Sequence, residues 1–317
     1  MKTVIVTGAA GFIGGQTVLR FKEAGYYVIG IDRKPCPEHL VDVADEFWRI
    51  DFVDTNCLHM VAKADPVAII HCAGTSLVGP SVADPEAYYE NNFVKTKQLL
   101  DYLKANRLTN IKVVFSSSAA VYGEPVMVPV SEEDPTAPIS PYGESKLMVE
   151  LLLKSYYHAY HQQYVAFRYF NVAGADPKGC HGNAKGGTHI MSRLLESTKE
   201  GTEFVLYGTD YPTPDGTCIR DYIHVSDLVE AHLLAVENNS IVGIFNLSND
   251  HGVSNKEVIA AVETVTGIHP AISTGAARPG DPAELTARAE NFKSATGWRP
   301  RYGLTDMLTH AWAWYNR

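Results

Sequence analysis

A tyrosine and a lysine placed four residues apart could together move a proton. Tyr142 and Lys146 follow Ser140-Pro141, and serine then proline is typical of the N-cap and first position of a helix. Four residues is about one helical turn, so both side chains are expected on one face. A tyrosine with its ordinary pKa of about 10 is a poor base, but Lys146, the helix N-terminus and an oxidised nicotinamide would stabilise the phenolate. The pair therefore predicts the acid–base group of a hydride-transfer reaction.

Such a pair also arises by chance, as an aromatic packing residue beside an exposed lysine. The chemical interpretation is favoured because a glycine-rich turn typical of dinucleotide sites and Ser116-Ser117-Ser118, which ends a predicted strand, both lie upstream of the pair. A hydroxyl at Ser118 could bond both the tyrosine oxygen and the reacting hydroxyl of a substrate.

A glycine-rich turn near the N-terminus predicts a dinucleotide site. Gly8-Ala-Ala-Gly11-Phe-Ile-Gly14 follows an apolar strand and opens a helix. Gly8 would permit the tight turn, Gly11 the close approach of a pyrophosphate, and Gly14 close packing of helix on strand. The free N–H groups and dipole of the helix N-terminus favour an anion there. The strand–turn–helix context makes this motif informative, which a lone glycine triplet is not.

The second predicted strand ends at Asp32, where an acid would bond the adenosine ribose hydroxyls. Its carboxylate would repel a 2′-phosphate and favours NAD over NADP, although the adjacent Arg33 could accept that phosphate. The alternative makes Asp32 a strand-end cap and Arg33 a solvated charge.

Elements that could position these residues alternate along the first half of the chain. Short apolar runs predict buried parallel strands at Thr3–Thr7, Val28–Ile31, Phe47–Ile50, Val67–His71, Ile111–Ser116 and Val165–Tyr169. Helices are expected at Phe12–Ala24, Leu58–Ala64, Glu86–Ala105 and Pro141–His161. This alternation predicts an α/β fold with a Rossmann-type doubly wound parallel sheet.

The second half is less regular. It predicts helices at Thr188–Glu200, Val225–Glu237 and Ser254–Thr266, the last with a capping box, and a strand at Ile241–Leu247 that returns to the first domain. We expect an NAD-binding domain of residues 1–170 plus about 225–247. A smaller, interleaved α/β lobe would comprise about 171–224 and 248–317.

Composition excludes several classes of protein. The 317 residues carry a net charge of −9, which argues against nucleic-acid binding. Five scattered cysteines form no CxxC pair, and the scattered histidines, including His39, His59 and His71, have no metal-like spacing. We find neither a signal peptide nor a stretch long and apolar enough to cross a membrane, and therefore expect a cytoplasmic protein without a metal.

Several segments resemble the UDP-hexose 4-epimerase branch of the extended short-chain dehydrogenase/reductase family. They span nearly the whole chain: TGAAGFIGG, SSSAAVYGE, SPYGESKLMVE, RYFNVAGADPKG, YGTDYPTPDGTCIRDYIHVSDL and ARPGDPAEL. The first three are shared by many nucleotide-sugar enzymes, whereas RYFNVAGADP and YPTPDGTCIRDYIHV are more specific. The resemblance implies NAD-dependent epimerisation at C4 of a UDP-hexose through a transient 4-keto sugar, and a homodimer formed through the 86–105 and 141–161 helices.

The resemblance also implies residue roles. Ser118 and Tyr142 would handle the sugar 4-hydroxyl, and Lys146 would bond the nicotinamide ribose. With the glycines and Lys146, the NAD site would be lined by Phe12, Ile13, Asp32, Arg33, Asp51, Phe52, Cys72, Ala73, Gly74, Ser76, Asn92, Ser116, Tyr142 and Phe170. The nucleotide diphosphate would be held by Asn171, His189, Tyr207, Arg220, Arg278 and Asp281. The alternative for the arginines is a surface ion pair, for example Arg220 with Asp221.

Three positions depart from the pattern of this family. Ser76 stands where some members carry a lysine, Ala120 replaces a hydroxyl residue, and Leu285 lies where side-chain bulk bears on an N-acetyl group. The substrate choice among UDP-hexose, UDP-N-acetylhexosamine and UDP-uronate therefore stays open. A 4,6-dehydratase needs an acid pair after Ser118, where this chain has two alanines. A non-catalytic NAD-binding regulator is disfavoured by the intact Ser118, Tyr142 and Lys146.

Overall fold

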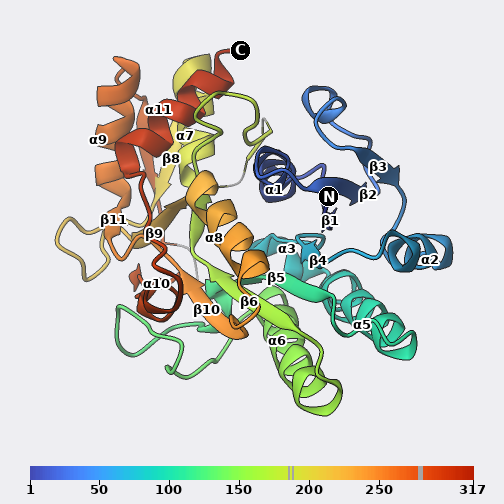
Figure 1. Ribbon diagram of the computed structural model, residues 1–317. Helices are drawn as coiled ribbons and strands as arrows, with labels where there is room; N and C mark the ends of the chain where they lie inside the picture. The colour runs from blue at the N-terminus through green and yellow to red at the C-terminus, as the bar shows by residue number, and fades with distance from the viewer. Residues whose placement is uncertain (185, 188, 278–280) are drawn as a thin grey trace. The chain divides into compact units, whose positions relative to one another are not determined.

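The chain forms two compact units that are interleaved in sequence (Figure 1). The computed structural model describes residues 1–184, 186–187, 189–277 and 281–317. The first unit contains Met1–Gly123, Thr136–Arg168 and Val229–Phe245, and the second contains Glu124–Pro135, Tyr169–Leu228 and Asn246–Arg317. Residues 124–135, which the sequence placed in the first domain, belong to the second unit because Val130 forms a parallel bridge with Ala287.

A seven-stranded sheet is the framework of the first unit. Its strand order is β10-β6-β5-β4-β1-β2-β3, and the pairings from β3 through β5 are parallel. The strands are β1 (Thr3–Thr7), β2 (Tyr27–Asp32), β3 (Glu46–Arg49), β4 (Ala68–His71), β5 (Lys112–Ser118), β6 (Tyr164–Tyr169) and β10 (Gly243–Leu247). The predicted doubly wound sheet is confirmed, including the return of the late strand β10. The order reverses between β1 and β4, which is where such sheets bind ligands.

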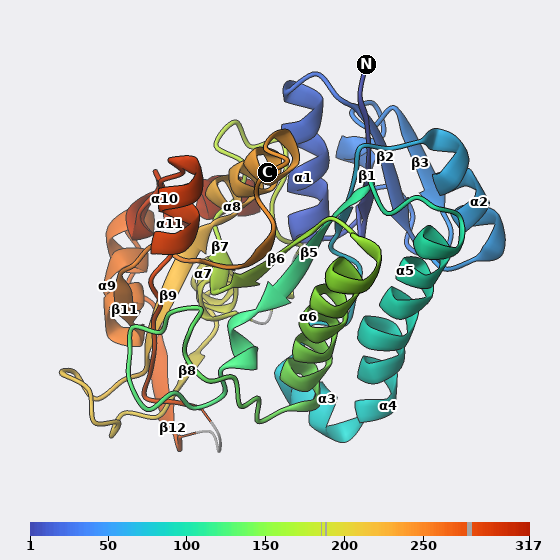
Figure 2. The ribbon, with the colours of Figure 1, turned by 60° about the horizontal axis from the view of Figure 1, so that its bottom comes forward.

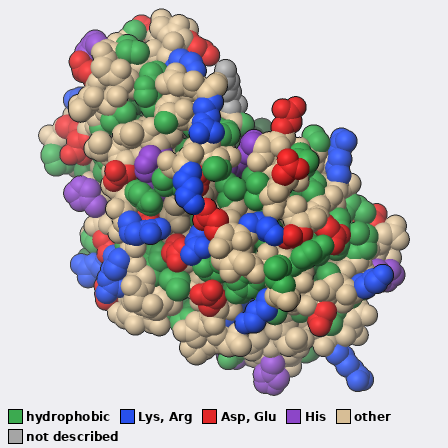
Figure 3. All heavy atoms as spheres, turned by 45° about the horizontal axis from the view of Figure 1, so that its top comes forward, with side chains coloured by type: hydrophobic (Ala, Val, Ile, Leu, Met, Phe, Trp, Pro, Cys, Tyr) green, Lys and Arg blue, Asp and Glu red, His purple; other side chains and the backbone are tan. Residues whose placement is uncertain are grey.

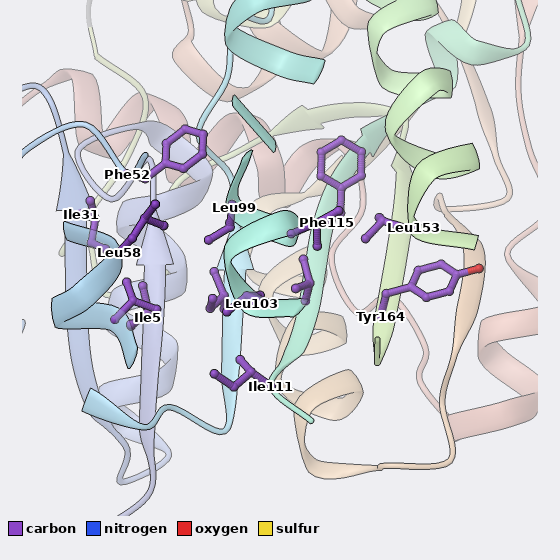
Figure 4. Packing of buried hydrophobic residues seen from close by; sticks show 14 of the residues in the cluster. Ile5, Ile31, Phe52, Leu58, Leu99, Leu103, Ile111, Phe115, Leu153 and Tyr164 are labelled. Carbon is purple, nitrogen blue, oxygen red and sulfur yellow. The ribbon is translucent and has the colours of Figure 1, made fainter. Parts of the chain in front are cut away.

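Helices of the first unit cover both faces of this sheet, and the last of them, α8, begins within the second unit and enters the first at Val229. They are α1 (Phe12–Glu23), η1 (Glu38–Leu40), α2 (Thr55–Ala64), α3 (Val78–Ala83), α4 (Pro85–Tyr88), η2 (Tyr89–Val94), α5 (Lys95–Ala105), η3 (Ala119–Val121), α6 (Pro141–Tyr160) and α8 (Val225–Glu237). Residues of α2, α5 and α6 pack with alternate sheet residues in one buried cluster, which includes Leu58, Leu103, Phe115 and Leu153 (Figure 4). Because strand residues alternate between faces, Phe167 lies on the opposite face from Ala166 of that cluster, and it stacks on His232 of α8.

The predicted 86–105 helix is interrupted. The structure has a short α4, a π-helical turn η2 and then α5, which lies beside α6 (Figure 2). Within the turn, the buried Asn92 forms side-chain hydrogen bonds to Thr75 and Ser145, and its carbonyl accepts a hydrogen bond from the Thr96 hydroxyl at 2.6 Å. Such side-chain bonds compete with the regular helical ladder, which apolar periodicity alone does not predict.

The second unit is built on short strands and three long helices. Its elements are β7 (Asn171–Ala173), α7 (Ile190–Glu200), β8 (Phe204–Tyr207), β9 (Ile219–His224), β11 (Gly252–Ser254), α9 (Asn255–Thr266), β12 (Ile272–Gly275), β13 (Glu284–Leu285), α10 (Glu290–Thr296) and α11 (Leu304–Tyr315). The predicted capping box of Ser254 and Glu257 is confirmed. The sequence did not predict β8 or β9; β8 pairs with β12, and β9 pairs with β7, β11 and β13.

The surface and helices give two further findings. None of the helices formed by the described residues combines the length and apolar character that crossing a bilayer requires. On the face shown in Figure 3, acidic and basic side chains are interspersed and form no continuous region of one sign.

Candidate active site

The glycine turn after β1 leaves no room for side chains at two positions. Gly8 has a φ of +72°, and a Cβ there would lie 2.7 Å from the Ala73 nitrogen. At Gly14 a Cβ would lie 2.1 Å from the Gly8 oxygen, so only glycine lets α1 pack this closely. Gly11 is the N-cap of α1 and makes no side-chain cap, so the first-turn N–H groups are offered to an anion by the backbone alone.

Asp32 lies directly beside this turn. One carboxylate oxygen accepts the Ala10 N–H at 3.1 Å and the other accepts the Lys34 N–H at 2.9 Å. Arg33 is exposed at the same strand end. The structure thus brings the predicted ribose acid to the glycine turn, where its oxygens retain lone pairs for a hydroxyl donor.

Two further predicted cofactor residues follow β3. Asp51 forms an ion pair with Lys95 of α5 at 2.6 Å. Phe52 is buried and its ring meets that of His71 edge-on, with 4.8 Å between centroids. These contacts fix Asp51 and Phe52 against α5 and β4.

The end of β4 is held by a chain of buried hydrogen bonds. The Thr96 hydroxyl donates to the Asn92 carbonyl and therefore accepts from His71 Nε2, at 2.9 Å. His71 Nδ1 is then the acceptor of the Thr7 hydroxyl at 2.7 Å, and the Thr7 oxygen in turn accepts the Ala73 N–H at 3.3 Å. Burial lowers the pKa of His71 to about 3, so the ring is neutral. These hydrogen bonds position the predicted Cys72-Ala73-Gly74 segment.

Asn92 connects that segment to the helix bearing Tyr142. Its side-chain oxygen accepts the Thr75 N–H at 2.7 Å, and its amide donates to the Thr75 carbonyl at 3.0 Å and to Ser145 Oγ at 2.9 Å. A Cβ at Gly74 would lie 2.8 Å from the Asn92 oxygen. Sequence reasoning did not single out Ser145 or Thr75, although Ser145 is a small polar residue inside the Tyr-x-x-x-Lys motif.

Tyr142 and Lys146 lie in the first turns of α6. Ser140 accepts the Gly143 N–H at 3.2 Å and Pro141 begins the helix, as predicted. Lys146 is 5% exposed, and its Nζ donates to the Ser116 carbonyl at 2.7 Å and lies 5.8 Å from the centroid of the Tyr142 ring. The Tyr88 ring meets that of Tyr142 edge-on. The structure therefore brings Ser116, Tyr142 and Lys146 together.

The pKa of Tyr142 differs from the sequence expectation of a lowered value. Burial raises the pKa of Tyr142, and its hydrogen bond with Ser118 opposes this only in part. Burial also lowers the pKa of Lys146 to about 8. The expectation counted an oxidised nicotinamide among three positive sources, whereas the protein alone offers Lys146 and the helix N-terminus against the effect of burial.

In the second unit, β9 carries the predicted substrate residue Arg220. Its guanidinium pairs with Asp281 and donates to the Ile219 carbonyl at 2.8 Å. The alternative pairing with Asp221 is wrong, because adjacent strand residues face opposite sides and Asp221 accepts the Asn249 N–H at 2.7 Å. Burial raises the pKa of Asp221 to about 7. Arg220 and Asp281, both predicted to hold the nucleotide diphosphate, are in direct contact.

Other predicted residues are placed as follows. Leu285 pairs in register with Arg220, and Asn171 pairs with Tyr222 of the same strand β9. Tyr207 ends β8 and His189 is the N-cap of α7. Phe12 and Ile13 begin α1. Phe170 is buried, whereas Ser76 is exposed. The Ala120 N–H donates to Ser118 Oγ at 3.2 Å. Arg278 lies outside the described residues.

Comparison with known proteins gives consistent matches along the whole chain. Residues 4–248 match the model of the NAD dependent epimerase/dehydratase family. The UDP-glucose 4-epimerase of Halalkalibacterium halodurans is 43% identical over 321 residues, which cover 98% of this chain and 95% of that protein. The crystal structure of UDP-glucose 4-epimerase from Brucella ovis in complex with NAD has a TM-score of 0.93 and 38% identity, covering 99% of this chain and 98% of that one. The Bifidobacterium longum enzyme in complex with NAD+ and UDP has a TM-score of 0.91 and 35% identity over 99% of this chain and 98% of that one.

Proposed function

The chain belongs to the NAD dependent epimerase/dehydratase family, and from that premise we propose that it inverts C4 of a UDP-hexose such as UDP-glucose or UDP-galactose. The reaction is an isomerisation that passes through a transient 4-keto sugar, with NAD as a tightly held cofactor. The observation that carries this proposal is the cluster of Ser118, Tyr142 and Lys146 in the same unit as the glycine turn.

The residues of the turn fit a dinucleotide. Backbone atoms close the space that a Cβ at Gly8 or Gly14 would fill, so the turn packs tightly, and the N-terminus of α1 at Gly11 carries no side-chain cap, which suits a diphosphate. The Asp32 carboxylate is anionic and adjacent, which suits the two free ribose hydroxyls of NAD. When bound, the nicotinamide supplies the acceptor and donor of the C4 hydride.

The protein residues would move the proton. Tyr142, as phenolate, takes the proton of the sugar 4-hydroxyl and later returns it from the opposite face of the sugar. Ser118 bonds both oxygens and keeps them in line, because its hydroxyl can donate to one and accept from the other. Lys146 is held over β5 by the Ser116 carbonyl and supplies positive charge beneath the phenolate. Arg220 would anchor the diphosphate while the hexose turns.

Elimination of water is disfavoured by the residues after Ser118. A 4,6-dehydratase needs an acid pair there, whereas Ala119 and Ala120 form the apolar turn η3. The second candidates are 4-epimerases of UDP-N-acetylhexosamine or UDP-uronate, because Leu285 lies in register with Arg220 in the proposed nucleotide-sugar lobe.

We extend the proposal to organisation and location. The first unit would bind NAD and the second the nucleotide sugar. A cytoplasmic location is supported by five free cysteines among the described residues. A homodimer is supported by the 57% exposure of Leu151 on α6. Leu99, Leu100 and Leu103 of α5 are buried in the core of the first unit and do not contribute to this surface.

Turnover of nucleotide sugars by the purified protein tests the function. We expect UDP-glucose and UDP-galactose to interconvert with no added oxidant, measured by separation of the two products. UDP-N-acetylglucosamine and UDP-glucuronate, assayed in parallel, define the sugar. Products that lack the elements of water would contradict the epimerase assignment.

Replacing Tyr142 by phenylalanine tests its role as general acid and base. General acid–base groups contribute about 10²–10⁴-fold to rate, so we expect Tyr142→Phe to lower kcat by that factor while NAD stays bound. Tyr160→Phe, on the exposed end of the same helix, is the matched control and should keep the wild-type rate. Substantial epimerase activity in Tyr142→Phe with NAD bound would contradict the mechanism.

A further inference from the structure

We propose that Glu150 and Arg168 form a buried positioning pair that fixes the serine run of β5 against α6, and so sets the geometry of Tyr142 and Lys146. The inference rests on the proposed function. It concerns residues that neither the motif nor the glycine turn includes. Neither side chain is proposed to touch substrate or cofactor.

The pair extends a stripe along one side of α6. Tyr142, Lys146 and Glu150 follow one another at four-residue spacing, so they share one face of the helix. Glu150 is fully buried and Arg168 of β6 is 4% exposed. The Arg168 guanidinium donates to Glu150 through Nη2 at 2.7 Å and through Nε at 3.1 Å, an approach in which both carboxylate oxygens are used.

The same carboxylate holds the middle residue of the serine run. Ser117 Oγ donates to Glu150 Oε1 at 2.5 Å. The residues on either side of Ser117 are those that contact the reactive pair: the Ser116 carbonyl accepts from Lys146, and Ser118 bonds Tyr142. Because three consecutive strand residues move together, a shift of Ser117 relative to α6 displaces both neighbours.

Arg168 also holds the chain that leaves the serine run. Its Nη1 donates to the Tyr122 hydroxyl at 2.8 Å, and its guanidinium lies 4.7 Å from the centroid of the Tyr122 ring. Tyr122 directly follows the turn η3, whose N-cap is Ser118. One guanidinium thus connects α6 to the residues after Ser118, while Glu150 connects α6 to the residue before it.

The cost of burying two charges favours a positioning role for Glu150 and Arg168 over a stabilising one. A buried ion pair gives up the hydration of two charges, so apolar residues of similar volume often stabilise a fold equally well. What an apolar pair cannot supply is the acceptor for Ser117 and the donor for Tyr122. The Glu150 carboxylate also opposes, in part, the burial that lowers the pKa of Lys146.

Two sets of variants test the proposal. Glu150→Met combined with Arg168→Met removes the pair without leaving a lone buried charge, and we expect kcat to fall about tenfold or more because catalytic geometry loosens. KM for UDP-glucose should stay within about twofold, since the proposed diphosphate anchors belong to the second unit. Ser117→Ala keeps the ion pair and cuts only its bond to the strand, so it should lower kcat by a smaller factor with only a small fall in melting temperature, even if the double variant folds poorly.

The control is a second ion pair of the first unit. Arg20 of α1 and Glu230 of α8 are 2.6 Å apart, and Arg20→Met with Glu230→Met should keep the wild-type kcat. Glu150→Gln combined with Arg168→Met, which retains an acceptor for Ser117, should recover part of the rate lost by the double methionine variant. Wild-type kcat in both Ser117→Ala and the double methionine variant would overturn this inference but not the proposed function. A wild-type protein inactive on every UDP-sugar would overturn the proposed function and this inference with it.

Discussion

Strand β5 of the first unit and strand β9 of the second unit hold their polar residues in different ways. Around β5, Ser116, Ser117 and Lys146 are nearly buried, and each has a partner within the same unit. On β9, Arg220 is paired with Asp281, whose side chain is 35% exposed. The first arrangement is preformed, whereas the second presents a cation whose present partner is a carboxylate open to solvent.

This difference indicates whether each region should govern substrate binding or the chemical step. A preformed buried constellation is suited to act on a transition state, because its geometry costs no reorganisation during reaction. A guanidinium paired with a half-exposed carboxylate can exchange that partner for a phosphate at low cost, since the surrounding water screens both charges. Changes around β5 should therefore lower kcat, and changes around β9 should raise KM.

The largest expected effect comes from the glycine turn of the first unit. In Gly14→Ala the new Cβ meets the Gly8 carbonyl, so α1 must move away from β1. We expect the free energy of unfolding to fall by about 1–3 kcal/mol and NAD affinity to fall below detection by calorimetry. Gly79→Ala in α3 is the control, because a Cβ there meets nothing within 4 Å and helix propensity improves. Normal NAD binding by Gly14→Ala would show that the first unit is less preformed than we argue.

How much of this the sequence could predict depends on the range of the interactions. The sheet, the glycine turn and the helix start at Ser140 follow from local patterns, and the structure contains them. The π-helical turn at Tyr89–Val94 does not, because it depends on Asn92 bonding Thr75, seventeen positions away. Strand β9 was missed because its residues, Ile219–His224, mix charged and apolar types and find partners in three separate segments. The burial of Tyr142, which raises its pKa, could not be predicted either, because burial is a property of the folded unit.

A smaller effect is expected at β9 and separates binding from chemistry. Hydrogen bonds to charged groups contribute about 1.5–3 kcal/mol, so Arg220→Ala should raise KM for UDP-glucose roughly tenfold to hundredfold with little change in kcat. Steady-state kinetics measure both constants. Arg299→Ala is matched, because the exposed Arg299 also donates to the preceding carbonyl, at 2.7 Å, and it should leave KM unchanged. A fall in kcat with constant KM in Arg220→Ala would contradict the assignment of binding to β9 and of chemistry to β5.

The smallest expected effect concerns pH and the rigidity of the first unit. Burial lowers the pKa of His232 in α8 from 6.5 to about 3, so the unfolded chain binds a proton in this window that the folded protein does not. The contribution of the neutral ring to stability is complete above pH 6.5 and is lost as pH falls toward 3, at about 1.4 kcal/mol per pH unit. His232→Gln should reduce the pH slope of the urea-unfolding free energy between about pH 4.5 and 6.5 by this share, while buried His71 continues to contribute its own. The exposed His158→Gln on α6 should not. An unchanged slope in His232→Gln would mean that the core around α1 and α8 opens to water before the unit unfolds, contrary to a preformed first unit.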